Sequence, residues 1–598
     1  MDKSEAVSRT KAPAPDSLLR VKLGLMVASA CIVVIAIYGT IACTAASELG
    51  SRTASEDYYN RLVDGFAKGR LSLALDPPPG LDALPNPYDP EANVRFRGSM
   101  YSPGRVHDLS YYKGRLYLYF SVVPALVLFL PFHLLTGGYV SHQQACFIFC
   151  SLGFLASVAL VSSVRRVCFP ETGWPALALG TLCVGLIPVV PIVLQRPDVW
   201  EVPLTASYGF WMLSLLGVWA CLNRPAQAWV PALCASAAAG LAIGCRPNSF
   251  LGAAMLLVPL FRAIRPFRGP DRGKGWRVGA ALIVPPALIG AGLLAYNHAR
   301  FGSMLEFGQR YQLNGDTVAS NKHFSPDFAW FNFRLYFLEY PGWGGHFPFV
   351  KGLVPPPIPA GHGGVDFPVG AIPMLPFVLC AAAVPLGFHG LAAGRRKPLA
   401  AIIAAILAVF ASNAVLLCLF FGTCLRYQLE FLPALVLLAA VGLLALESHL
   451  PERRLPRFGL RAAVCAAAAA SIAFNLLMTA NLRAHTDVIR GGITMQSGRP
   501  DEAEHRFRDA LRLRPYDLDI RLDLVAVLYE QGKLAEALAG TERALAVSPE
   551  SAPAHYLRGC VLYRMGSVEE AVAECQTALR LQPGFLPASS ALRQMHRG

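Results

Sequence analysis

The sequence predicts an all-α protein in which a polytopic bundle of membrane helices is followed by an α-solenoid. Two observations carry this prediction. The chain of 598 residues is 54% hydrophobic and only 15% charged, and its apolar residues gather in runs long enough to cross a bilayer. The segment after residue 482 instead repeats small residues and proline at a fixed step.

The repeat length is 34 residues. Four sets of residues recur at this spacing: Gly498, Gly532 and Gly566; Ala503, Ala537 and Ala571; Ala510, Ala544 and Ala578; and Pro515, Pro549 and Pro583. Glycine ends a first helix in a turn, alanine lets two helices approach closely, and proline cannot continue the second helix. The pattern matches the tetratricopeptide repeat over two full units, Asp501 to Arg580. We therefore expect a repeat domain at 483–598.

Charge and cysteine content exclude two other classes. The formal net charge is +14, but the basic residues lie in short blocks between apolar runs. The positive-inside rule for membrane proteins explains that distribution better than nucleic-acid binding does, so no nucleic-acid partner is expected. The 15 cysteines lie mostly singly within apolar runs and form no C-x-x-C pair. Neither a disulfide framework nor a cysteine-ligated metal is therefore expected.

The membrane body is predicted at 23–482, after a cytoplasmic tail at 1–22. Apolar runs of the required length are found at 23–45, 143–164, 173–194, 203–222, 228–245, 249–261 (short), 279–297, 367–388, 398–421, 427–446 and 460–482. The first run exceeds the apolar core of a signal peptide, which predicts an uncleaved signal anchor. The short pair 228–245 and 249–261 need not span fully and could instead be half-helices that line a cavity.

A further run at 117–137 decides the topology. Pro124 and Pro131 interrupt it, and we expect it to be re-entrant or to lie on the surface. All basic blocks then fall on the inner side, as the positive-inside rule requires. About 11 crossings follow in the plasma (inner) membrane, with a cytoplasmic amino terminus. The loops 46–116 and 298–366 and the repeats are expected on the extracytoplasmic side.

The first outer loop carries the candidate catalytic groups. Glu56 and Asp57 stand just ahead of 58–71, whose apolar residues have the spacing of a surface helix. In a structural role, either carboxylate complements the N-terminal dipole of that helix. In a catalytic role, it is a general base that takes a proton from a hydroxyl acceptor. Asp89 and Asp108 are the alternatives for that role within the loop.

Other ionisable groups lie at the outer ends of the predicted spans, where such groups are functional candidates by default. Arginine is suited to holding a phosphate. The candidate substrate-binding residues are Arg97, Asp108, Asp198, Arg246, Arg300, Arg426 and Tyr427. Glu201 is an alternative to Asp198. For Arg426, the structural alternative is a pair with Glu430, four residues later on one helix face.

At these residues the chain resembles the C superfamily of membrane glycosyltransferases, in its large bacterial branch, over about residues 15–480. The likeness rests on an ordered set: acids and a tyrosine that open a long first outer loop (Glu56, Asp57, Tyr59), a proline-containing apolar segment that does not cross (Tyr119 to Leu135), an acid outside the third crossing (Asp198 or Glu201), the element Gly240 to Pro247, and Arg426-Tyr427 ahead of Pro433. Membrane mannosyltransferases with carboxyl-terminal tetratricopeptide repeats on the outer side are similar in layout.

The resemblance implies inverting transfer of a sugar from a polyprenyl-phosphate donor to an acceptor at the outer face. The first-loop acid is then the base. Glu56 and Asp57 both stand one or two residues closer to the tyrosine than in the family, so the choice between them stays open. The charge of the leaving phosphate needs arginine, lysine or a divalent cation (Mg or Mn), with Asp198 as a ligand. No compact carboxylate cluster demands such an ion.

The repeats are expected to hold a protein partner or the acceptor in their concave groove. Two rival functions remain: an O-antigen-ligase-like transferase of diphosphate-linked oligosaccharides, and a membrane-anchored scaffold for envelope assembly. A transporter is disfavoured, because the sequence lacks an internal repeat of hydropathy. Ending the chain after about Asn481 removes none of the candidate residues. An enzyme shortened in this way is therefore expected to keep its activity toward a small acceptor.

Overall fold

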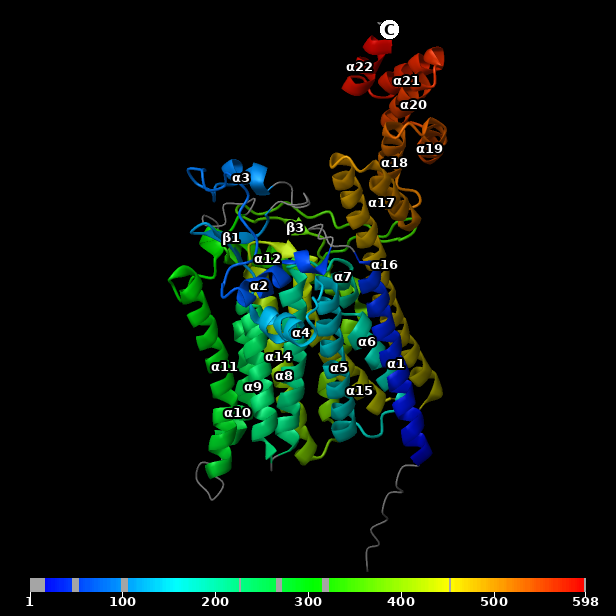
Figure 1. Ribbon diagram of the computed structural model, residues 1–598. Helices are drawn as coiled ribbons and strands as arrows, with labels where there is room; N and C mark the ends of the chain where they lie inside the picture. Colours follow the sequence, from blue (N-terminus) through cyan, green and yellow to red (C-terminus); the bar gives the residue numbers. More distant parts are fainter. Residues whose placement is uncertain are drawn as a thin grey trace, which may run out of the picture.

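The computed structural model describes residues 17–45, 53–97, 106–224, 227–264, 272–313, 322–450 and 453–595. Long helices run side by side in a bundle, and a helical extension stands on one end of it (Figure 1). We call that end the outer end. The predicted all-α class is confirmed, since the strands of the described residues are two short pairs.

The bundle contains most of the predicted apolar runs as helices. They are α1 (Ser17–Thr44), α5 (His142–Cys168), α6 (Trp174–Leu186), α8 (Glu201–Asn223), α9 (Trp229–Cys245), α10 (Leu257–Ile264), α11 (Arg272–Phe301), α14 (Ala393–Leu419), α15 (Leu432–Ser448) and α16 (Arg454–Gln496), with 3₁₀ helices η4 (Pro247–Leu256) and η8 (Pro376–Phe388). The run predicted at 173–194 is broken, because α6 ends before Pro188 and α7 (Val190–Gln195) follows.

Six helices in the described part of the chain are long and apolar enough to cross a membrane, which indicates a multi-pass membrane protein. They are Gly24–Thr44, His142–Cys168, Glu201–Asn223, Gly275–Phe301, Ala393–Leu419 and Arg454–Gln496. Five shorter apolar helices accompany them, at Ala125–Thr136, Pro175–Leu186, Trp229–Cys245, Pro376–Phe388 and Leu432–Ser448.

The proline-interrupted run at 117–137 does not form a long helix. A π-helical turn at Ala125–Phe129 continues into α4 (Leu130–Thr136), with Pro131 in its first turn. These 12 residues span about 18 Å at 1.5 Å per residue, well short of a hydrocarbon core of about 30 Å. The segment lies beneath α2 (Tyr58–Ala67), towards the outer end (Figure 1).

Short elements cover the outer end. They are α2, α3 (Pro90–Arg97), the hairpin β1 (Leu109–Tyr112) and β2 (Arg115–Leu118), α7, α12 (Ala329–Phe333), β3 (Val365–Asp366), α13 (Ala371–Met374) and β4 (Thr423–Cys424). The helix predicted at 58–71 is confirmed as α2, which ends at Ala67. Tyr59, Leu62 and Val63 are fully buried on one of its faces. The hairpin turns through Lys113 and Gly114, both at positive φ, as a two-residue turn requires.

The parallel pair β3–β4 places Asp366 opposite Cys424. A 3₁₀ helix, η9 (Leu425–Glu430), follows β4, and α15 starts only at Leu432. The expected span at 427–446 therefore begins later than predicted. Arg426 and Tyr427 lie in the 3₁₀ turn outside that helix.

The 34-residue repeats form helix pairs, as predicted. The helices are α17 (Pro500–Leu513), α18 (Leu518–Glu530), α19 (Leu534–Val547), α20 (Ala552–Arg564), α21 (Val568–Leu581) and α22 (Leu586–Met595). Gly498, Gly532 and Gly566 all have positive φ and end first helices. The six register alanines are fully buried between helices. No break separates the membrane body from the repeats, because α16 runs through residue 482 to Gln496.

Candidate functional site

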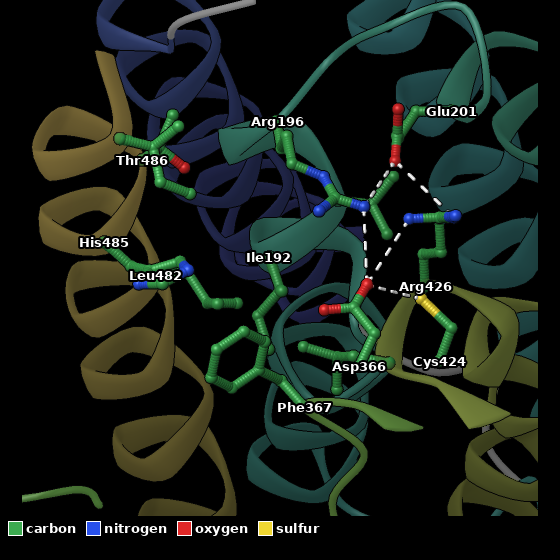
Figure 2. A pocket seen from close by; sticks show the side chains of 13 residues that line it. Ile192, Arg196, Glu201, Asp366, Phe367, Cys424, Arg426, Leu482, His485 and Thr486 are labelled. Carbon is green, nitrogen blue, oxygen red and sulfur yellow. Dashed lines mark hydrogen bonds and ion pairs between the residues drawn. The ribbon is translucent and has the colours of Figure 1, made fainter. Parts of the chain in front are cut away.

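Charged side chains gather at the outer end, around a small cavity of about 80 Å³ that we call the outer pocket (Figure 2). This volume has room for several water molecules. Three segments meet there: the end of α7 with the start of α8, the strand pair β3–β4, and the upper part of α16. The lining residues are Ile192, Val193, Arg196, Glu201, Asp366, Phe367, Cys424, Leu425, Arg426, Leu482, His485, Thr486 and Ile489.

Two arginines share two carboxylates on one side of the outer pocket. Arg426 Nε lies 3.9 Å from Glu201 Oε1, and its Nη1 lies 3.5 Å from Asp366 Oδ2. Arg196 Nη2 lies 3.4 Å and 3.7 Å from the same two oxygens. Burial alone would raise the pKa of Asp366, but the two guanidinium groups outweigh it and hold that pKa below its usual value.

A second arginine–carboxylate pair adjoins the first. Arg246 Nε lies 2.8 Å from Glu430 Oε1, and Asn248 donates to the other carboxylate oxygen at 3.1 Å. The pairing of Glu430 with Arg426 on one helix face is therefore wrong, because both residues lie in the 3₁₀ turn and Glu430 faces Arg246. The Tyr427 ring centroid is 5.4 Å from each guanidinium carbon, a distance suited to a cation–π contact.

Asp108 is connected to this cluster through Trp200. Its two carboxylate oxygens accept from Trp200 Nε1 at 2.7 Å and from Gln312 Nε2 at 2.8 Å. The guanidinium carbon of Arg426 lies 5.8 Å from the Trp200 ring. Asp108 also has a φ of 53°, and such strain at a non-glycine residue is typical of functional sites.

The pKa values of two partly buried tyrosines reflect the charges around Asp108. The pKa of Tyr58 is raised to about 12 by burial, and the carboxylates of Asp108 and Asp198 add to the rise. The pKa of Tyr119 is raised to about 12 by burial and by Asp108, with Arg246 opposing. Asp198 itself is fully buried, and its backbone N–H donates to Glu201 Oε2 at 3.1 Å. Asp108, Asp198, Arg246, Arg426 and Tyr427 are thus brought together.

The first two catalytic candidates lie beside this cluster rather than in it. Asp57 is 5% exposed. One of its carboxylate oxygens accepts the backbone N–H of His142 at 2.9 Å, and the other lies 3.8 Å from His142 Nδ1. The carboxylate thus meets the start of α5, and it makes no capping bond to α2. Glu56 is exposed, in the 3₁₀ turn Ala54–Glu56 (η1).

Arg300 and Arg97 are placed apart from the outer pocket. Arg300 donates to the Leu118 carbonyl at 2.9 Å and to Asn297 Oδ1 at 2.7 Å. It thereby ties the end of α11 to β2. Arg97 ends α3, and its side chain lies outside the part of the chain that the structure describes.

An apolar cavity of about 430 Å³ lies where the re-entrant run packs against α9 near Gly244. Its lining comes from α2, the π-helical turn, α9 and α11: Phe66, Leu71, Val122, Val123, Leu126, Val127, Leu130, Leu241, Ile289, Gly292, Leu293 and Tyr296. Ser121 Oγ donates to the Gly244 carbonyl at 2.6 Å. This bond joins the start of the re-entrant run to the end of α9, two residues before Arg246.

In the part of the chain that the structure describes, no group of three His, Cys, Asp or Glu side chains is placed to hold a metal ion. Several polar residues of the outer pocket, among them Asp366 and His485, were not selected from the sequence. Asp366 is the last residue of the expected outer loop 298–366, and only its position beside an apolar run could have indicated a role. His485 was assigned to the repeats, and the sequence contains no signal that places a repeat residue in this pocket.

Comparisons with known proteins identify the carboxyl-terminal part. Tetratricopeptide repeat profiles match residues 494–559 and 552–585, which confirms the predicted repeats. The first such domain of human RPAP3 is 22% identical, with a TM-score of 0.19, over 19% of this chain and 90% of that chain. The Arabidopsis OM64 domain is 18% identical, with a TM-score of 0.18, over 19% of this chain and 94% of that chain.

A solved structure also overlaps the membrane body. The Archaeoglobus fulgidus oligosaccharyltransferase is 13% identical, with a TM-score of 0.38, over 75% of this chain and 56% of that chain. No curated protein matches the chain. The glycosyltransferase resemblance of the body therefore stays a prediction.

Proposed function

We propose that the protein is a membrane glycosyltransferase that moves a sugar from a polyprenyl-phosphate donor to an acceptor hydroxyl at the outer face. One observation carries the proposal: a single chain segment lines the apolar cavity and also contacts the end of α9 beside the arginine cluster. Ser121 of this segment donates to the Gly244 carbonyl, two residues before Arg246. The lining residues from the same segment are Val122, Val123, Leu126, Val127 and Leu130.

A polyprenyl phosphate has an apolar chain and an anionic head, so its site needs an apolar groove that ends at cations. The cavity of about 430 Å³ falls within the range of about 300–1,000 Å³ for ligand sites. Arg246 and Arg426 flank Tyr427 at the polar end. Guanidinium groups bind phosphate with bidentate hydrogen bonds, and here they would stabilise the charge of the leaving group.

In the reaction that we propose, a carboxylate takes the proton of the acceptor hydroxyl. The acceptor oxygen forms a bond to the anomeric carbon, and the bond from that carbon to the phosphate oxygen breaks. The bonding pair leaves with polyprenyl phosphate. Asp108 is the base that the geometry favours, because two N–H donors fix its carboxylate near Arg426. Asp57 is the alternative, and a divalent cation remains a prediction that no step requires.

The proposed base is tested by substitution in the full chain. Asp108→Asn should lower transfer from a polyprenyl-phosphate hexose by about 10²–10⁴, the usual effect of losing a general base. Asp57→Asn should leave the rate nearly unchanged and lower stability by about 1–3 kcal/mol, because the His142 N–H loses its charged acceptor. The opposite result would assign the base to Asp57. Inertness of the unsubstituted chain toward every such donor would contradict the enzyme and favour a scaffold.

The proposal also includes the topology. The eleven apolar runs other than 117–137 cross the membrane, and the start of α1 and the repeats lie at opposite ends of the bundle (Figure 1). The repeats are then extracytoplasmic. An alkaline phosphatase fusion after Arg580 should be active, and a tag near Lys274 should be protected from external protease. Activity of a reporter that works only in the cytoplasm, fused after Arg580, would refute the count.

A further inference from the structure

The last membrane helix is also the first helix of the repeats. Helix α16 has 43 residues, about twice the number that a bilayer crossing needs. Its upper part pairs with α17 as a repeat does: a Cβ on Gly491 would lie 2.8 Å from the Phe507 ring. Gly559 stands two repeat lengths later and meets α21 in the same way. Residues 483–496 of α16, which we call the first-repeat helix, therefore belong to the repeats.

One face of this helix forms a wall of the outer pocket. Leu482, His485 and Ile489 are spaced by three and four residues, so they lie on one side of α16. Figure 2 shows His485 and Leu482 on α16, across the pocket from Arg196 and Arg426. The wall is apolar except for the imidazole and a threonine, whereas the opposite side is charged.

The position of the wall is fixed by contacts with the membrane body. The Phe367 ring packs edge-on against His485 at 5.1 Å. The His346 ring lies 4.2 Å from that of Tyr516, so the outer loop also contacts the turn after α17. Helix α16 also packs against α7, which ends at Gln195, one residue before Arg196 of the charged cluster.

The equivalent positions of the next repeat continue this face outward. Asp519 and Asp523 in α18 stand 34 residues after His485 and Ile489. Both are exposed, and neither forms an ion pair within the described residues. The concave face of a repeat array is an extended binding surface. Here that surface begins at the outer pocket and has uncompensated negative charge one repeat away.

Building on the proposed function, we infer that the acceptor is an extended polypeptide with a basic side chain, held along the repeats so that it passes His485 and Ile489 and presents its hydroxyl to the charged cluster beside the outer pocket. The first-repeat helix is then part of the acceptor site. His485 hydrogen-bonds the acceptor backbone. Asp519 and Asp523 select the basic residue by charge complementarity.

The inference is tested in the full chain with a polyprenyl-phosphate hexose and peptides that carry Ser or Thr flanked by Lys or by Glu. Transfer to peptide and slow cleavage of the donor by water are measured separately. Ile489→Trp should fill the pocket and lower peptide transfer by about 10²-fold, a far larger loss than any in donor cleavage by water. Gln576→Trp is the matched control, since Gln576 is exposed on α21, far from the pocket.

Two further variants separate binding from folding. His485→Ala should raise the KM for peptide about tenfold with no change for the donor, and His485→Gln should restore part of the loss. Asp519→Lys combined with Asp523→Lys should reverse the preference from Lys-flanked to Glu-flanked peptides. A thermal midpoint equal to that of Gln576→Trp excludes misfolding.

The outcomes distinguish the two proposals. If the Ile489→Trp and Gln576→Trp variants both cleave the donor and transfer the sugar to peptide at equal rates, the inference is overturned and the proposed function stands. Transfer to free or lipid-linked glycans, but to no peptide, would also overturn it. Lack of donor cleavage by the unsubstituted chain would overturn the proposed function and the inference with it.

Discussion

The first repeat and the later repeats share one sequence pattern but have different surroundings. In the first, the charged residue Asp487 is fully buried, with Arg483 Nε at 3.1 Å and Arg506 Nη1 at 3.6 Å. Glu536 of the second repeat instead pairs at 2.8 Å with Arg508 of α17, and both side chains are about half exposed. The carboxylate of the first repeat is thus buried in its ion pairs, whereas that of the second lies at the surface.

This difference shows that a repeat pattern fixes the helix pair but not the role of the pair. Gly498 and Gly532 have nearly the same φ, 70° and 76°, so the turns are equivalent. What differs is the face opposite the turn. In the first repeat it meets Phe367 and the outer pocket, and in the second it is open. A solenoid contacts mainly its own neighbouring repeats, and the first repeat departs from that rule.

Truncation at two points gives the largest expected effect. A chain that ends after Asn481 loses His485 and Ile489, which line the outer pocket. Its transfer even to a small acceptor should fall by about 10²-fold or more, because the reacting groups lose a positioning wall. A chain that ends after Asp517 keeps α16 and α17 and should retain most of that activity. The sequence alone led to the opposite expectation, that a chain cut after Asn481 keeps its activity toward a small acceptor, and this experiment decides between the two predictions.

The control for this experiment is the assembled state of each truncated chain, measured by size-exclusion chromatography in detergent. Full activity after the shorter cut would make the first repeat an appendage like the others. The difference between the two regions would then be one of packing only.

Substitution of the two acids gives a smaller effect and sharpens the comparison. Asp487→Ala leaves two partly buried guanidinium groups without their partner, which should cost about 3 kcal/mol, the lower end for a buried pair. Glu536→Ala breaks an exposed pair and should cost less than about 1 kcal/mol. Pulse proteolysis of the full chain measures both. Equal losses of stability in the two variants would mean that the first repeat is packed no more tightly than the second.

Much of this architecture could be predicted from local pattern. The register alanines, the glycine turns and α2 follow from spacing within one or two helices, and the structure contains each of them. The break at Pro188 and the late start of α15 were not predicted, because apolar composition continues through both. Long-range pairing was the other limit: the Arg246 partner, Glu430, is 184 residues away.

In the candidate site, too, some residues could be predicted from local pattern and others could not. Asp108, Arg246 and Arg426 were selected because ionisable groups at span ends are rare. Asp57 was preferred on its place in the loop, yet its carboxylate meets the start of α5, a contact that no local spacing reveals. His485 could not be found at all, since its role depends on the unbroken continuation of α16 into the repeats.

Lowering the pH gives the smallest expected effect, and it tests how the first repeat packs against the membrane body. Burial lowers the pKa of His485, with the charges of Arg514 and Arg196 acting in the same direction. The native state therefore resists protonation, and its stability falls as the pH drops below about 6.5, where the unfolded chain takes up the proton first. The second repeat has Asp519 at the position equivalent to His485, so the imidazole is the group to replace. His485→Phe should keep the ring contact with Phe367 and remove this acid sensitivity.

Protease cleavage between α16 and α17, followed from pH 7.5 to 5.5, should rise in the original chain and stay flat in the variant. A rise of the same size in both chains would place the acid-sensitive group outside the first repeat and remove this distinction between the two regions.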